Sequence, residues 1–240
     1  LYGSVLYPGG KFRNTPCELQ AGQLVRENGA WTIKTGDLNS KDESGNIITS
    51  INGPLQSNQQ FVNKTGFFFR KFLDEKAGSS MRNGNRSTMW WPYFRISEAY
   101  LIACEASFET GKQTEALTYI NAVRKRAGVQ SLTAITFENI VHENAVEFAF
   151  EFHRWWDLKR WRLSDKVLNG DNNSPTARHR RLWPYKVVAQ GNPHDGQWVF
   201  IEDKYFMSPN ARHFQMRNYY NFIDDAWVDN NPKLVKNPYQ

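Results

Sequence analysis

The stretch EFHRWWDLKRW, residues 151–161, decides the fold of this chain. It crowds three tryptophans together with acidic and basic side chains in one short helical pattern. Tryptophan is costly to leave in water, and charged side chains are costly to bury unless they are paired. We therefore expect a packed seam whose charges hydrogen-bond to fixed partners. Taken alone, the segment is either a structural staple or a docking surface.

Two helices are predicted upstream of this stretch, because apolar residues recur there at spacings of three and four. The first begins near Arg95 and has an expected small-residue packing face of Ile96, Ala99, Ala103 and Ala106. The second spans about 114–127 and stops at Gly128, a common residue after a helix end. Together they form an antiparallel hairpin of about one tetratricopeptide-type repeat, roughly 34 residues.

A third helix is predicted to begin at Thr136, a residue type that caps helix N-termini. Its pattern runs on through residues 151–161, with acidic residues leading and basic residues following, as the helix dipole favours. The expected apolar stripe consists of Val141, Ala145, Phe148, Phe152 and Trp155. The carboxylates and arginines beside this stripe are expected to form ion pairs that set helix register, rather than a catalytic carboxylate pair.

The flanking segments look different from the helical centre. Residues 1–60 are rich in Gly, Asn and Ser, which predicts long loops with short strands or turns. Near the other end, residues 182–188 and 198–202 predict a β-hairpin across a turn-rich connection. We therefore expect one mainly α domain over 1–240, with a loop-rich segment at 1–90, helical repeats at 91–165, and loops with a hairpin at 166–240.

Three segments in this order closely resemble the C-terminal half of SusD/RagB-like proteins, an outer-membrane nutrient-binding family. They are RISEAYLIACEA at 95–106, YINAVRKRAG at 119–128 and EFAFEFHRWWDLKRW at 147–161. The match extends to Thr65-Gly66-Phe67 and to the ending NPKLVKNPY at 231–239, so the resemblance covers most of the chain.

The chain departs from the family pattern in three places. It has Asn144 where the family usually has arginine, and Phe152 where the family usually has glycine. Residues 206–210 stand where the family tends to carry a Pro-Ile-Pro-like segment.

The resemblance implies a fold of tetratricopeptide-like helical hairpins with long loops and a small β-hairpin, in proteins about twice this length. It implies a cell-surface lipoprotein of polysaccharide utilisation that captures oligosaccharide for a TonB-dependent, SusC-like outer-membrane transporter, without performing chemistry. On this resemblance the lipid anchor lies in an N-terminal part that is missing here. A RagB-like branch handles peptides, and this alternative stays open beside a protein-interaction scaffold that binds no small ligand.

Composition argues against several other classes of function. The formal net charge is +6, but basic residues are scattered and the densest cluster, residues 178–181, predicts solvated charge rather than a nucleic-acid surface. The two cysteines cannot form a disulfide framework, and Cys104 is expected to be a small buried hydrophobe. Histidine spacing offers no metal site, and we expect no cofactor and no catalytic residues.

Sugar binding needs a flat aromatic face together with planar polar groups for the hydroxyls. Trp31 is the leading candidate ligand-binding residue because a tryptophan in a polar loop has no helical stripe to explain it. Arg26 and Asn28 lie close by in the sequence, and Tyr7 is the second aromatic candidate.

Overall fold

The computed structural model describes residues 3–55, 62–76, 87, 89–174, 176–178, 180–204 and 210–240, except the side chains of 203 and 204. His179 of the basic cluster and residues 206–209 lie outside these ranges. The chain forms two compact units. The helical unit comprises Phe72–Asp74 and Ser79–Arg160, and the sheet unit comprises Leu1–Lys71, Glu75–Gly78 and Trp161–Gln240.

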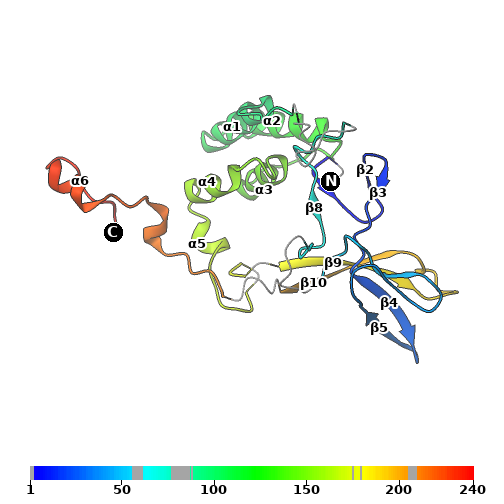
Figure 1. The fold of residues 1–240 in the computed structure, drawn as a ribbon. Helices are drawn as coiled ribbons and strands as arrows, with labels where there is room; N and C mark the ends of the chain where they lie inside the picture. Colours follow the sequence, from blue (N-terminus) through cyan, green and yellow to red (C-terminus); the bar gives the residue numbers. More distant parts are fainter. Residues whose placement is uncertain are drawn as a thin grey trace. The chain divides into compact units, whose positions relative to one another are not determined.

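The predicted helical hairpin is confirmed as α1 (Ile96–Glu109) and α2 (Gln113–Arg126), which pack against each other in Figure 1. On α2 the buried side chains are Ala116, Ile120 and Val123, whereas Ala127, expected on the same stripe, is exposed. On α1 the expected small-residue face is wrong, because Ile96 is 69% exposed. The helix is instead rotated so that Leu101 and Cys104 face inward. Burial of these two side chains removes more apolar surface from water than burial of alanines would. Both cysteines are free, and Cys104 is buried as expected.

The third helix is divided into α3 (Phe137–Glu147) and α4 (His153–Arg160). Thr136 caps α3 as predicted, within a capping box completed by Asn139. The expected continuous stripe is wrong beyond Phe148, because Phe152 is 77% and Trp155 46% exposed. The backbone is left-handed at Phe150 and Phe152, which resets the helical register between α3 and α4.

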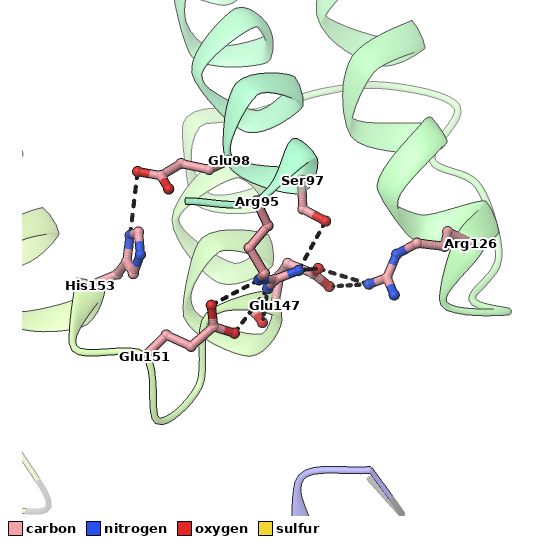
Figure 2. A network of polar contacts seen from close by, with 7 residues as sticks. All are labelled: Arg95, Ser97, Glu98, Arg126, Glu147, Glu151 and His153. Atoms are coloured by element: carbon pink, nitrogen blue, oxygen red, sulfur yellow. Dashed lines mark hydrogen bonds and ion pairs between the residues drawn. The ribbon is translucent and has the colours of Figure 1, made fainter. Parts of the chain in front are cut away.

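The expected ion-pair network is confirmed in the helical unit. Figure 2 shows the Arg95 guanidinium between the carboxylates of Glu147 and Glu151, with bonds of 2.7–3.0 Å. Arg126, the last residue of α2, also donates to Glu147 at 2.7 Å. Arg124 with Glu143 joins α2 to α3, and Arg160 with Glu105 joins α4 to α1. Within α4, Arg160 also pairs with Asp157.

The sheet unit contains a four-stranded mixed sheet of β4 (Gly22–Glu27), β5 (Ala30–Lys34), β9 (Arg180–Val188) and β10 (Trp198–Lys204). The strand order is β10-β9-β4-β5 (Figure 1). β4 runs parallel to β9, and the two outer pairs are antiparallel. The predicted hairpin is therefore confirmed as β9–β10, but no local pattern predicts that β4 and β5 extend it into a sheet.

One face of this sheet carries the core of the unit. Ala21, Trp183 and Tyr185 form a buried cluster against which Leu24 and Ile201 pack. The Trp183 indole donates to the Lys64 carbonyl oxygen at 3.1 Å. The adjacent Gly66 has φ of 98°, and a Cβ there would lie 2.1 Å from the Leu182 carbonyl oxygen. Only glycine fits this approach of the loop to β9.

Short elements complete the sheet unit. The paired short strands are β1 (Val5–Leu6) with β8 (Phe68–Phe69), β2 (Lys11–Phe12) with β3 (Thr15–Pro16), and β6 (Ser40–Lys41) with β7 (Ile47–Thr49). The short helices are α5 (Ser164–Val167), the 3₁₀ turn η1 (Met216–Tyr219) and α6 (Asp225–Asn230). The tetratricopeptide-like helical pairs thus coexist with more strand than the expected mainly α architecture contains.

Candidate functional site

The leading candidate, Trp31, lies on a β-hairpin and not in a loop as expected. Strands β4 and β5 are joined by Asn28 and Gly29, which have φ of 51° and 83°. Two consecutive left-handed residues define the type I′ turn, for which Asn-Gly is the preferred sequence. This dipeptide between two short apolar runs was the signal that could have revealed the hairpin. Asn28 therefore has a structural role in the turn, and its part in binding remains a prediction.

The hairpin presents its aromatic side chain to solvent. Trp31 is 45% exposed and directly opposes Arg26 across the two strands. The guanidinium carbon of Arg26 lies 6.0 Å from the centre of the indole ring, at the outer range of a cation–π contact. Strand alternation places both side chains on the sheet face that carries Leu24 and the core cluster. The result is a flat apolar surface beside a planar donor group.

An ion pair joins β4 and β5 on the opposite face of the hairpin. Lys34 forms an ion pair of 2.5 Å with Glu27, and both side chains are about half exposed. This hydrogen bond, the first of several contributions from nearby carboxylates, raises the pKa of Lys34. The pair links the two strands on the face of the hairpin opposite Trp31.

Tyr7 is not brought next to Trp31. It lies between β1 and β2, where its carbonyl oxygen accepts a hydrogen bond of 3.0 Å from the Gly10 amide. A Cβ on the neighbouring Gly9 would lie 3.6 Å from the indole nitrogen of Trp198 on β10. Since β10 and β5 are the two edges of the sheet, three strand spacings or roughly 14 Å separate the Tyr7 loop from the Trp31 strand. The structure brings together Trp31, Arg26 and the Asn28 turn, and places Tyr7 toward the other edge.

The remaining features bear on other classes of site. Within the described ranges, no group of three or more histidine, cysteine, aspartate or glutamate side chains is arranged to hold a metal ion. A membrane-spanning helix needs about 20 apolar residues, and no helix in the described part of the chain reaches that length and hydropathy.

Comparison with known proteins identifies the family to which this fold belongs. The model of the SusD family matches residues 1–239. The chain belongs to the SusD family. The resemblance seen in the three helical segments is thereby confirmed over essentially the whole chain.

Among curated relatives, the SusD-like protein P2 of Formosa agariphila is 33% identical over 112 residues, covering 41% of this chain and 22% of the relative. A SusD-like protein of Bacteroides ovatus is 36% identical over 84 residues, covering 33% of this chain and 15% of the relative. These matches span less than a quarter of each relative's length.

Two solved structures share the fold. A SusD-like protein from Bacteroides fragilis superposes with a TM-score of 0.58 and 18% identity, covering all of this chain and 38% of that protein. The surface glycan-binding protein A from Bacteroides uniformis gives a TM-score of 0.50 and 17% identity, covering 93% of this chain and 46% of that protein. At these identities the likeness establishes the fold alone.

Proposed function

We propose that this protein binds glycans at the bacterial cell surface and delivers them to a TonB-dependent, SusC-like transporter in the outer membrane, without catalysing a reaction. The observation that carries the proposal is the family match over residues 1–239. One protein of similar fold is named a surface glycan-binding protein, which agrees with this role.

The chemistry of the β4–β5 hairpin supports a sugar ligand. An exposed indole offers a flat face for the apolar side of a pyranose ring, and the Arg26 guanidinium offers several hydrogen-bond donors in one plane. Because β5 is the edge strand of the sheet, an extended oligosaccharide can approach Trp31 without crossing other strands. We therefore assign Trp31 as the main stacking residue and Arg26 as its polar partner.

The carboxylates of the helical unit support binding without chemistry. Glu147 and Glu151 accept hydrogen bonds from Arg95, and Glu143 accepts from Arg124. A general acid needs a carboxyl group that can hold a proton near the scissile bond. These carboxylates are instead occupied by guanidinium donors that tie the helices together.

The test compares the parent with Trp31→Ala by affinity gel electrophoresis against a panel of soluble polysaccharides, followed by calorimetry with oligosaccharides of the retained polymer. We expect the parent to bind at least one glycan and Trp31→Ala to bind it at least tenfold more weakly. Trp227→Ala is the matched control, since Trp227 is also exposed but lies on α6.

Two results would redirect the proposal. Retention of casein-derived peptides with no glycan bound would favour the RagB-like peptide carrier. Binding of neither ligand class would favour a protein-interaction scaffold. Equal affinities of Trp31→Ala and Trp227→Ala for a bound glycan would remove Trp31 from the site while leaving the proposed function in place.

A further inference from the structure

The sheet face opposite Trp31 carries a row of side chains that runs across all four strands. Strand register places Lys34 opposite Gln23, Gln23 beside Lys186, and Lys186 opposite Trp198. Residues in register share a face of the sheet, so the row passes from the β5 edge to the β10 edge. It places an amide, an ammonium and an indole next to one another.

A polar hollow lies over the middle of this row. Its volume is about 690 Å³, within the roughly 300–1,000 Å³ typical of ligand pockets. It is bounded by the turn before β7, by the end of β9 and by the β9–β10 connection. The charged and amide side chains that line it are Gln20, Gln23, Asn46, Lys186, Gln190 and Asp195, and Ser44 adds a hydroxyl.

The inner wall of the hollow is held by buried amides. Gln23 is 1% and Gln20 5% exposed, and both line the hollow. The Gln23 amide nitrogen donates to the Asp42 carboxylate at 2.9 Å, and that of Gln20 donates to the Ile48 carbonyl oxygen at 2.9 Å. These bonds tie the turn of residues 42–46 to the sheet. The wall is therefore pre-organised, which lowers the entropic cost of binding.

The outer wall is fixed by its own turn. The Asp195 carboxylate accepts a hydrogen bond of 2.8 Å from the Ala189 amide, and the Gly196 amide donates to the Val187 carbonyl oxygen at 2.9 Å. These bonds hold the β9–β10 connection against the end of β9. Gln190 is exposed at the mouth of the hollow, where its amide is accessible to a ligand.

The charges in the hollow favour a neutral, hydroxyl-rich ligand. Lys186 supplies one cation and Asp195 one anion, while the other polar groups are neutral amides and a serine hydroxyl. A phosphate or a carboxylated sugar would meet only one ammonium and would be repelled by Asp195. Amides donate and accept hydrogen bonds, as sugar hydroxyls do. The Trp198 ring lies 5.8 Å from the Lys186 ammonium, next to Lys186 in the row but outside the lining of the hollow.

We propose that this hollow is a second subsite for neutral sugar residues, on the face of the sheet opposite Trp31. The inference rests on the proposed function, since it assigns the same class of ligand. Two sites on opposite faces bind separate stretches of a long polysaccharide and raise its apparent affinity without strengthening the binding of a short oligosaccharide at Trp31.

The experiment uses the 240-residue chain, the double variant Lys186→Met with Gln190→Ala, and the control Lys34→Met. Methionine keeps an alkyl stem against Trp198 and removes the ammonium. Lys34 belongs to the same row but lies outside the hollow. We expect the hollow variant to lose at least fivefold in retention by the polysaccharide that the parent binds, whereas Lys34→Met is retained like the parent.

Hydrogen exchange locates the contact. Addition of a long oligosaccharide of that polymer should protect residues 42–47 and 189–196 as well as 26–33, and the first two protections should vanish in the hollow variant. Parental retention of that variant, with protection confined to 26–33, would overturn the second subsite and leave the proposed function standing. A parent that binds no glycan would overturn both. Thermal unfolding of each variant verifies that it is folded.

Discussion

The helical unit and the sheet unit bury polar groups of different kinds. In the helices the buried groups are carboxylates such as Glu143 and Glu151, and each is held by an arginine from another element. The sheet unit also buries a charged side chain, Arg181, but beside the hollow its buried groups are the amides of Gln20 and Gln23, bonded to backbone and to a turn. A buried charge depends on its partner far more than a buried amide does. Substitutions in the polar network of the helical unit, which carries the family's sequence signature, should therefore lower stability more than substitutions of the amides in the sheet unit, which carries the candidate ligand sites.

The largest effect is expected from removing the central arginine of the helical network, Arg95. Arg95→Met takes away the bonds to Glu147 and Glu151, whose side chains are only 8% and 4% exposed. Leaving a buried carboxylate without its partner costs about 3–5 kcal/mol. We expect the free energy of unfolding measured in urea to fall by about that amount, with glycan affinity of the folded fraction unchanged.

Arg126→Met is the matched control for Arg95. Its side chain is 58% exposed, and Glu147 keeps its bonds to Arg95 when Arg126 is lost. An exposed ion pair contributes only about 0–1 kcal/mol. Equal destabilisation by the two substitutions would contradict the idea that burial of the carboxylates decides the cost.

The corresponding test in the sheet is Gln23→Leu. Leucine fills a similar volume but cannot donate to Asp42 or to the Ile47 carbonyl oxygen. The expected loss is about 1–3 kcal/mol, the cost of leaving hydrogen-bonding groups unsatisfied. Urea unfolding gives the total loss, and faster hydrogen exchange in residues 40–49 shows whether it arises in the turn. A loss as large as that of Arg95→Met would erase the contrast between the two units.

The sequence allowed prediction of the helices and the family, but only part of the candidate site. Periodicity and capping located α1, α2 and the start of α3, because these signals are local. The pairing of β4 with β9 joins residues 22–25 to residues 185–188, and no local pattern encodes a parallel pairing across that distance. The absence of a helical stripe around Trp31 predicts its exposure, and the structure gives a different reason for that exposure, namely an edge-strand hairpin closed by Asn28 and Gly29.

A smaller effect is expected at the junction that places Glu151. Phe152 has φ of 65°, in the left-handed region where non-glycine residues cost about 1–2 kcal/mol. The family usually has glycine at this position, and the structure explains that preference. Phe152→Gly and Phe152→Ala both remove the ring that stacks on Trp91 at 5.5 Å, but only glycine relieves the backbone.

We therefore expect Phe152→Gly to be more stable than Phe152→Ala by about 1 kcal/mol in urea unfolding. The comparison between the two variants isolates the backbone, since the stacking contact is absent from both. If the alanine variant matches or exceeds the glycine variant, the left-handed conformation is not a source of strain, and Glu151 is positioned by Arg95 alone.

The smallest expected effect is the change in unfolding free energy with pH that Asp42 contributes in the turn of residues 42–46. The hydrogen bond from Gln23 holds the pKa of Asp42 below its ordinary value, and the Asn46 and Ser44 amides act in the same direction against burial. Because the folded-state pKa is the lower one, the carboxylate stabilises the fold fully above pH about 4. That contribution is lost as pH falls through the lowered folded-state pKa. The difference in unfolding free energy between the parent and Asp42→Asn should therefore be constant from neutral pH to about 4 and shrink in stronger acid. A difference that stays constant into stronger acid would mean that the charge of Asp42 adds nothing to the turn, and the hollow beside it would then keep its shape without that charge.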